Sequence, residues 1–209
     1  MIGIINMKTN NINCFVKILK KNNYKYKIIN NYDDYKNEQI EKLILPGIGS
    51  YNYVIEYLKE NNLDNVILEH HHSNKKILAI CIGMQILTEK GTEGGDSTGI
   101  GIFKDSYTIK IESNLILPNI GWNNLIYSEK INNNINFKKL FNGINKDSDF
   151  YFVHSYHCIL ENNINTIKSK FGTAEFNALI ITDNILATQF HPEKSGNNGL
   201  KLLKNFLIW

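Results

Sequence analysis

The sequence predicts an α/β fold in which helices flank a mostly parallel central sheet and antiparallel strands extend that sheet in the C-terminal half. Three observations support this prediction. Short runs rich in Ile and Leu alternate with helical periodicity up to residue 80. From residue 107 the apolar runs are short and follow one another closely. An amphipathic segment at residues 197–207 then closes the chain as a helix.

The first half of the chain contains four candidate parallel strands. They lie at residues 2–5, 26–29, 42–45 and 76–80. Apolar residues at helical spacing predict helices between them, at residues 12–19, 53–58 and 63–70. Because parallel strands need crossover connections, this alternation favours a sheet with helices on both faces.

The second half is predicted to pair mainly in antiparallel fashion and to extend the same sheet. Its candidate strands lie at residues 107–111, 150–153, 164–169, 176–180 and 185–188. The glycine-rich segment 91–101 and the Asn-rich segment 132–136 are expected to be loops. We expect residues 1–209 to form one domain, since a chain of this length can bury about 70% of its extended-chain surface.

The composition excludes several classes of protein. The sequence has no apolar run near 18 residues and no positively charged start before a hydrophobic stretch, so we expect a cytoplasmic protein without a membrane span or signal peptide. The net charge of +3 is small and the lysines are scattered, which argues against nucleic acid as a partner. Cys14, Cys81 and Cys158 are widely spaced and odd in number, so we expect reduced thiols, without a disulfide framework or a zinc site of paired cysteines. We expect no metal and no cofactor.

The chain contains no arginine, and all 23 basic residues are lysines. Two-pronged guanidinium clamps for carboxylate or phosphate are therefore missing from this chain. An anionic substrate would have to be held by backbone amides, by lysines or by a partner chain.

A strand-to-helix turn surrounds Cys81. The apolar run 76–80 ends at this cysteine, and the small residues Ala79 and Gly83 flank it, as a nucleophile elbow requires. Amides at the start of a helix beginning near Gly83 would favour the thiolate. The alternative is a buried structural thiol, because free cysteine is one of the most buried residue types.

A candidate base lies near the C-terminal end of the chain. His191 and Glu193 flank a proline just after a predicted strand, and an imidazole oriented by a carboxylate could take the proton of a cysteine nucleophile. Alone this is weak evidence, since a histidine before proline is usually structural.

Six ordered segments carry a resemblance to a known family. They are residues 45–49 (LPGIG), 81–85 (CIGMQ), 99–101 (GIG), 118–123 (PNIGWN), 150–156 (FYFVHSY) and 189–195 (QFHPEKS). The chain resembles the class I, triad-type glutamine amidotransferases, and among them the HisH family of glutaminase subunits of imidazole glycerol phosphate synthase.

The resemblance implies roles for individual residues. The catalytic residues would be Cys81 as nucleophile, His191 as proton shuttle and Glu193 as its orienting group. The backbone at Ile48, Gly49 and Ile82 would hold the oxyanion. The substrate L-glutamine would be bound by Gly47, Gln85, Glu93, His154 and Ser155. The partner interface would include Asn11, Asn119, Trp122, Asn123, Tyr156 and Lys194.

The implied partner is a (β/α)₈-barrel synthase or cyclase subunit, HisF-like, which would form a heterodimer with this chain. Glutamine would be hydrolysed through a cysteine thioester, and the ammonia would be used to make imidazole glycerol phosphate and AICAR in histidine biosynthesis. Asn119 stands where the family commonly has histidine, Ala79 replaces an elbow glycine, and residues 6–11 depart from the usual first loop. These departures leave open a paralogous glutaminase that supplies ammonia for amidotransfer to a surface-glycan sugar.

Other interpretations remain open as well. The chain could be a non-catalytic interaction module with this fold, or a cysteine hydrolase of another ester or amide. His154 could be a surface histidine, and Trp122 could pack within the domain. The run at residues 70–72, three histidines, is interpreted as a solvated helix end, because successive helical side chains diverge and rarely share one metal ion.

Overall fold

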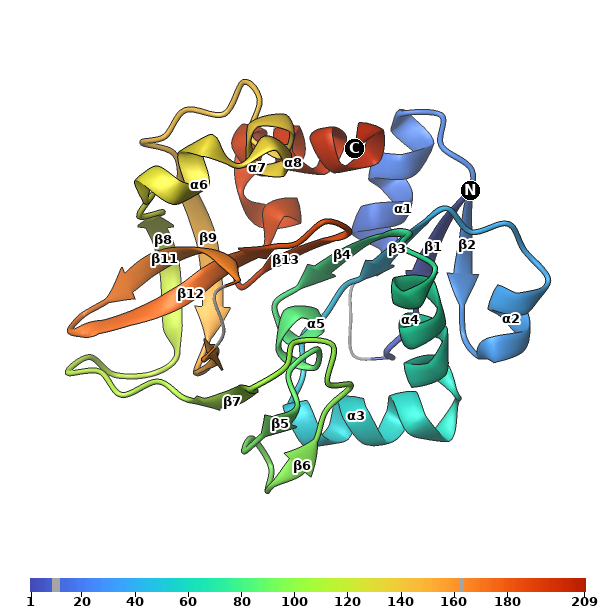
Figure 1. The fold of residues 1–209 in the computed structure, drawn as a ribbon, viewed down its shortest axis with the longest axis horizontal. Coiled ribbons are helices and arrows are strands. Elements are labelled where there is room, and N and C mark those ends of the chain that lie inside the picture. The colour runs from blue at the N-terminus through green and yellow to red at the C-terminus, as the bar shows by residue number, and fades with distance from the viewer. Residues whose placement is uncertain (9–11, 162–163) are drawn as a thin grey trace.

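A seven-stranded sheet forms the centre of the computed structural model, which describes residues 1–8, 12–161 and 164–209 (Figure 1). The strand order is β11-β12-β13-β4-β3-β1-β2. Parallel pairing joins β1 (Ile2–Ile5), β2 (Tyr26–Ile29), β3 (Lys42–Leu45), β4 (Lys76–Ile80) and β13 (Ile185–Thr188). Antiparallel pairing adds β12 (Ala174–Ile181) and then β11 (Asn165–Phe171).

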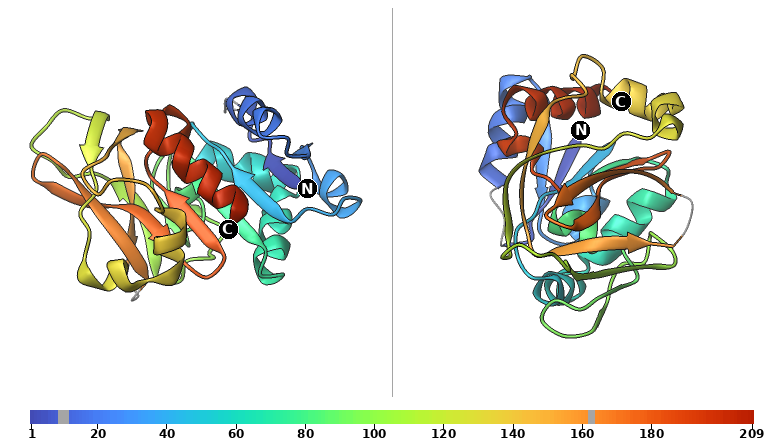
Figure 2. Two further views of the ribbon diagram at one scale, coloured as in Figure 1. Left: turned by 90° about the horizontal axis from the view of Figure 1, so that it is seen from above. Right: turned by 90° about the vertical axis from the view of Figure 1, so that its left-hand side faces the viewer.

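Helices cover both faces of this sheet. Figure 1 shows α1 (Ile12–Lys21), α7 (Ile135–Leu140) and α8 (Gly196–Ile208) above it. On the opposite face lie α3 (Tyr51–Glu60), α4 (Leu63–His72) and α5 (Ile82–Gln85), while α2 (Tyr32–Lys36) follows the edge strand β2. The layers are also visible from above in Figure 2.

The two apolar cores follow from the alternation of side chains along each strand. Ile44 and Leu78 point to one face and pack with the core that includes Phe15 and Phe206. Their neighbours Leu43 and Ile77 point to the other face and pack with the core beneath α3 and α4. Strands buried on both faces need continuous apolar runs, which is why the sequence identified them correctly.

Two smaller sheets complete the fold. One has the order β10-β7-β5-β6, and the other pairs β8 with β9. Their strands are β5 (Lys90–Gly91), β6 (Ser97–Thr98), β7 (Ser106–Lys110), β8 (Asn119–Asn124), β9 (Asp149–His154) and β10 (Tyr156–Leu160). The remaining elements are α6 (Glu129–Asn133) and the 3₁₀ turn η1 (Pro192–Lys194).

The structure confirms the α/β class and corrects several details. The four N-terminal strands, the strand at residues 185–188 and the closing helix lie where they were predicted. The C-terminal strands do not all extend one sheet: β7 and β9 belong to the smaller sheets, and β13 is parallel to β4. The glycine-rich segment contains the short strands β5 and β6, and the Asn-rich segment forms parts of α6 and α7.

The prediction of a solvated histidine run was wrong for His70. Its side chain is 0% exposed, its Nδ1 lies 3.1 Å from the Tyr35 hydroxyl and its Nε2 lies 3.3 Å from the Lys76 carbonyl oxygen. The carbonyl can only accept, so Nε2 carries a proton. Among the described residues, no group of three or more His, Cys, Asp or Glu side chains is placed to hold a metal ion. None of the helices these residues form has both the length and the apolar character needed to cross a membrane.

Burial of His70 gives a testable pH dependence of stability. Burial lowers the pKa of His70 to about 4, below its ordinary value. The unfolded chain therefore takes up this proton first as the pH falls, and the free energy of unfolding decreases between about pH 6.5 and 4 by up to ~1.4 kcal/mol per pH unit. Urea unfolding at pH 7.5 and pH 5 should show a smaller loss for His70→Gln than for the wild type. Equal losses would contradict this role of His70.

Candidate active site

Cys81 lies at the carboxyl end of the central strand β4, directly before α5. Its backbone has φ 52° and ψ −109°, a conformation that is rare for any residue except glycine and costs roughly 1–3 kcal/mol. A hydrogen bond of 2.7 Å from its amide to the Thr188 carbonyl oxygen holds the turn against the neighbouring strand β13. The sequence thus forms the sharp elbow that was predicted.

Glycines make this elbow possible. A Cβ atom on Gly83 would collide with the carbonyl oxygen of Leu45, at the end of the adjacent strand β3. One on Gly47 would collide with the side chain of Ile82. The turn after β3 and the turn after β4 therefore pack directly against each other, as expected for neighbouring parallel strands.

The same sheet brings His191 to Cys81. Strand β13 pairs with β4, and the chain reaches His191 three residues after β13 ends. The ring is 1% exposed, and its Nδ1 lies 2.8 Å from Oε1 of Glu193. Two further bonds fix this segment, from the His191 amide to the Tyr151 carbonyl oxygen at 2.9 Å and from the Ser195 hydroxyl to the His191 carbonyl oxygen at 2.7 Å.

The electrostatics favour the protonated form of the His191 imidazole. Burial by itself lowers the pKa of His191, but a hydrogen bond and charge interaction with Cys81, followed by those with Glu193, raise it to about 10. Because Nδ1 is used by the Glu193 carboxylate, Nε2 is the nitrogen that can exchange a proton with the sulfur. Nε2 is buried, and among the described residues its interaction is with Cys81.

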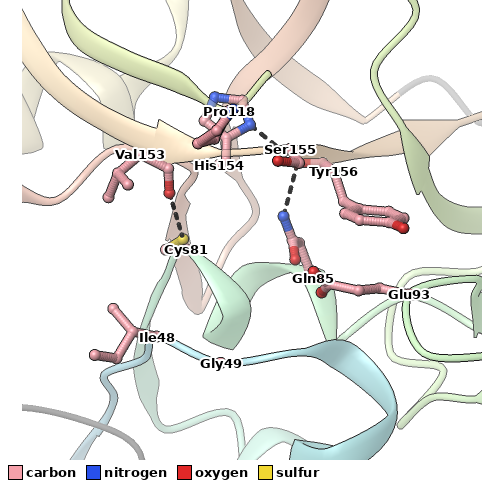
Figure 3. Close-up of a pocket in the computed structure, with 10 residues that line it drawn as sticks. All are labelled: Ile48, Gly49, Cys81, Gln85, Glu93, Pro118, Val153, His154, Ser155 and Tyr156. Carbon is pink, nitrogen blue, oxygen red and sulfur yellow. Dashed lines mark hydrogen bonds between the residues drawn. The ribbon is translucent and has the colours of Figure 1, made fainter. Parts of the chain in front are cut away.

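A pocket opens in front of Cys81 (Figure 3). It has a volume of about 230 Å³, below the roughly 300–1,000 Å³ of pockets for drug-sized ligands, and so suits a small metabolite. Its lining consists of Ile48, Gly49, Cys81, Gln85, Glu93, Pro118, Val153, His154, Ser155 and Tyr156. Most residues predicted for the substrate and oxyanion sites are therefore together in one place.

The two ends of the pocket differ in character. Glu93 is half-buried and accepts a 3.0 Å hydrogen bond from the Tyr51 amide, and burial raises the pKa of Glu93 although that bond opposes the rise. Its carboxylate can hold an ammonium group. Ile48 and Gly49, in the turn after β3, also line the pocket, and Gly49 has φ 135°. Gly47 and Ile82 are buried and approach each other behind this lining.

His154, which lines the pocket, forms a buried pair with Asn119. The Asn119 side chain, predicted for the partner interface, is 2% exposed and instead lies 3.0 Å from Nε2 of His154. Nδ1 of His154 is 2.9 Å from the Tyr156 carbonyl oxygen. His154 is thus not a surface histidine, and burial lowers its pKa to about 4, so its ring is neutral.

The other described residues predicted for the interface are at least partly exposed, and Tyr156 among them also lines the pocket. Trp122 on β8 is 53% exposed and makes an edge-to-face contact with Tyr151 at 5.9 Å between ring centroids. Lys194 is exposed, with its Nζ 5.9 Å from the centroid of the Tyr151 ring. Asn123 and Tyr156 are partly exposed. Asn11 lies outside the described residues.

Sequence reasoning gave no individual role to three residues at this site. Pro118 and Val153 line the pocket, and Gln189 is buried with its Nε2 3.6 Å from the Cys81 sulfur. The sequence offered one signal for Gln189, which is its position. It stands two residues before His191, on the segment that the sheet brings to Cys81.

Comparison with known proteins identifies the family. A family model described as glutamine amidotransferase class-I matches residues 4–209. The imidazole glycerol phosphate synthase subunit HisH 1 of Campylobacter jejuni (strain 81-176) is 40% identical, over 99% of this chain and 98% of its own. The chain belongs to the HisH family of class I glutamine amidotransferases.

Further comparisons agree with this membership. The HisH subunit of Caldanaerobacter subterraneus is 40% identical, over 99% of this chain and 97% of its own length. The HisH fold seen here superimposes on a solved glutamine amidotransferase with a TM-score of 0.71 and 15% identity, over 99% of this chain and 97% of that one. PurLQS from Thermotoga maritima gives a TM-score of 0.70 at 17% identity, with the same coverage.

Proposed function

We propose that this chain hydrolyses L-glutamine to glutamate and ammonia, with Cys81 as the nucleophile. The observation that carries the proposal is that three groups lie together: the Cys81 sulfur at a strained elbow, the His191 ring that interacts with it, and the Glu193 carboxylate 2.8 Å from that ring. Family membership makes glutamine the expected substrate.

The reaction has two halves. The Cys81 sulfur attacks the side-chain amide carbon of glutamine, and His191 protonates the departing nitrogen, so that a thioester and ammonia result. Water activated by His191 then releases glutamate. Backbone amides of Ile48, Gly49 and Ile82 are the candidates for holding the oxyanion, a contribution typically worth ~3–4 kcal/mol per donor.

We further propose that the ammonia passes to a synthase partner in histidine biosynthesis. The relatives are named as subunits of imidazole glycerol phosphate synthase, and this chain matches them over nearly its full length. A (β/α)₈-barrel, HisF-like subunit is the expected partner. Trp122 is exposed on β8, the strand that pairs with β9, and β9 contributes Val153 and His154 to the pocket that contains Cys81.

A reconstitution experiment tests this function. The chain, mixed with the barrel subunit of the same organism, is expected to hydrolyse glutamine and to support glutamine-dependent formation of imidazole glycerol phosphate and AICAR. The same gene should let a strain that lacks its HisH subunit grow without histidine. Hydrolysis without growth, together with ammonia transfer to a sugar acceptor, would instead support the surface-glycan alternative. No hydrolysis with any partner would support an interaction module.

Substitution of Trp122 tests the proposed interface. Trp122→Ala should weaken the complex with the barrel subunit by at least ~10-fold in Kd, because a large exposed aromatic at an interface is a typical anchor. Isothermal titration calorimetry measures the change. Ile208→Ala is the matched control, since Ile208 is 78% exposed at the other end of the sheet, beside Trp209 and the start of β4. Equal affinities for both variants would place the interface elsewhere.

A further inference from the structure

Gln189 is buried in the same region as the proposed nucleophile. Its side chain is 0% exposed, and its Nε2 donates toward the Cys81 sulfur at 3.6 Å. Its Oε1 accepts a 3.0 Å hydrogen bond from Nε2 of Gln85. A buried amide with both ends occupied is held in one place, so its orientation matters for the sulfur.

The orientation of both amides is fixed by a single backbone carbonyl. Nε2 of Gln85 lies 2.8 Å from the Tyr156 carbonyl oxygen, which can only accept, so this end of Gln85 must be the NH₂ group. Both of its hydrogens are then used, one on Tyr156 and one on Gln189. The Gln189 atom that receives the second hydrogen must be its oxygen.

This hydrogen-bond pattern also determines which end of the Gln189 amide faces the Cys81 sulfur. If the oxygen of Gln189 faces Gln85, its NH₂ group must face Cys81, and a flipped amide would place two NH₂ groups against each other. Figure 3 shows the Gln85 nitrogen directed at Tyr156, while its oxygen lies on the side of Glu93, within the pocket. His154 donates to the same Tyr156 oxygen from the other side, through Nδ1 at 2.9 Å.

We propose that Gln189 is a catalytic residue whose amide N–H stabilises the Cys81 thiolate and whose oxygen holds Gln85 for the substrate. The proposal rests on the proposed function of Cys81 as nucleophile. The protonated thiol instead points at the Val153 carbonyl oxygen, 3.9 Å away, which cannot stabilise a thiolate. The N–H of Gln189 gains strength when the proton leaves, because hydrogen bonds to charged acceptors are about twice as strong as neutral ones.

Two variants separate the roles of the two ends of the amide. Gln189→Glu keeps the size of the side chain and an oxygen that can accept from Gln85, but it replaces the donor at the sulfur with an acceptor. Gln189→Leu removes both hydrogen bonds. Asn205→Leu is the matched control. Asn205, on α8, is 7% exposed and donates hydrogen bonds to the carbonyl oxygens of Leu140 in α7 and Asn142 in the loop after α7.

The test is the pH dependence of Cys81 alkylation by iodoacetamide. The full chain is used in a Cys14→Ser background, and the Cys81 peptide is quantified by mass spectrometry. We expect the midpoint of the rate profile to rise by about one pH unit in Gln189→Leu and further in Gln189→Glu, because each loses the donor to the thiolate and the second adds a negative charge. Asn205→Leu should keep the wild-type midpoint.

Steady-state kinetics of glutamine hydrolysis test the second role proposed for Gln189, which is to hold Gln85 for the substrate. Gln189→Glu should lower kcat with little change in KM, whereas Gln189→Leu should also raise KM. An alkylation midpoint that stays at the wild-type value in folded Gln189→Glu would overturn the role of Gln189. Absence of glutamine hydrolysis by the wild-type chain mixed with its barrel subunit would overturn the proposed function instead, because alkylation by iodoacetamide reports the acidity of the Cys81 thiol without glutamine.

Discussion

Cys81→Ala is expected to abolish glutamine-dependent synthesis by the complex while leaving ammonia-dependent synthesis unchanged. The substitution removes the sulfur that we propose forms the thioester, and loss of a nucleophile from a triad typically lowers kcat by on the order of 10⁶-fold. The proposed barrel subunit should still use ammonia from solution. Both rates are measured on the purified complex, one with glutamine and one with an ammonium salt at alkaline pH.

Cys14→Ala is the matched control for this prediction. Cys14 lies on α1, is partly exposed and, like Cys81, is a free thiol. This variant should keep both activities. If Cys81→Ala lost the ammonia-dependent activity as well, Cys81 would be holding the complex together rather than acting on glutamine.

Glu193→Gln is expected to slow glutamine hydrolysis by about 10²- to 10⁴-fold without unfolding the chain. The Glu193 carboxylate holds Nδ1 of His191 at 2.8 Å and contributes to the raised pKa of that ring. An amide of the same shape keeps the packing but removes the negative charge, so the pKa of His191 should fall. The imidazolium is then lost at lower pH, and the alkaline limb of the rate profile should move to lower pH.

The control for this substitution is Glu175→Gln. Glu175 pairs with Lys168 at 2.7 Å on the surface strands β11 and β12, where an exposed ion pair contributes little to stability. Circular dichroism and thermal unfolding verify the fold of both variants. A wild-type rate and an unmoved pH profile for Glu193→Gln would show that this carboxylate does not orient the base.

The central strands could be predicted from sequence because their burial leaves a direct signal. A strand covered on both faces must be apolar at every position, and Ile77 to Ile80 are each 0% exposed. The pairing of the later strands could not be predicted, because short strands with one polar face carry little information about their neighbours. The order of the strands in the smaller sheets is determined by tertiary contacts.

The short helices were missed for a different reason. The abundance of asparagine around residue 134 suggested a loop, yet Asn134 is the N-cap of α7 and accepts a 2.9 Å hydrogen bond from the Phe137 amide. Ser128 caps α6 in the same way, by accepting from the Ile131 amide at 3.3 Å. Asparagine and serine favour both turns and N-caps, so composition alone did not separate the two.

At the candidate site, sequence alone could place Cys81 on a strand-to-helix turn but could not bring His191 to it. That step depends on the pairing of β13 with β4, which joins segments about 110 residues apart. Asn119 shows that a match to a position in a family's sequence pattern does not determine which way the side chain points. It pairs with His154 across β8 and β9, and this register turns its side chain inward.

Covalent trapping of the nucleophile tests the central claim most directly. The chain, with its barrel partner present, is treated with a diazo-ketone analogue of glutamine, and the modified residue is located by peptide mass spectrometry. We predict one adduct per chain, on the peptide that contains Cys81, and protection by excess glutamine. An adduct on Cys14, or no adduct on a folded and partner-bound chain, would contradict the account.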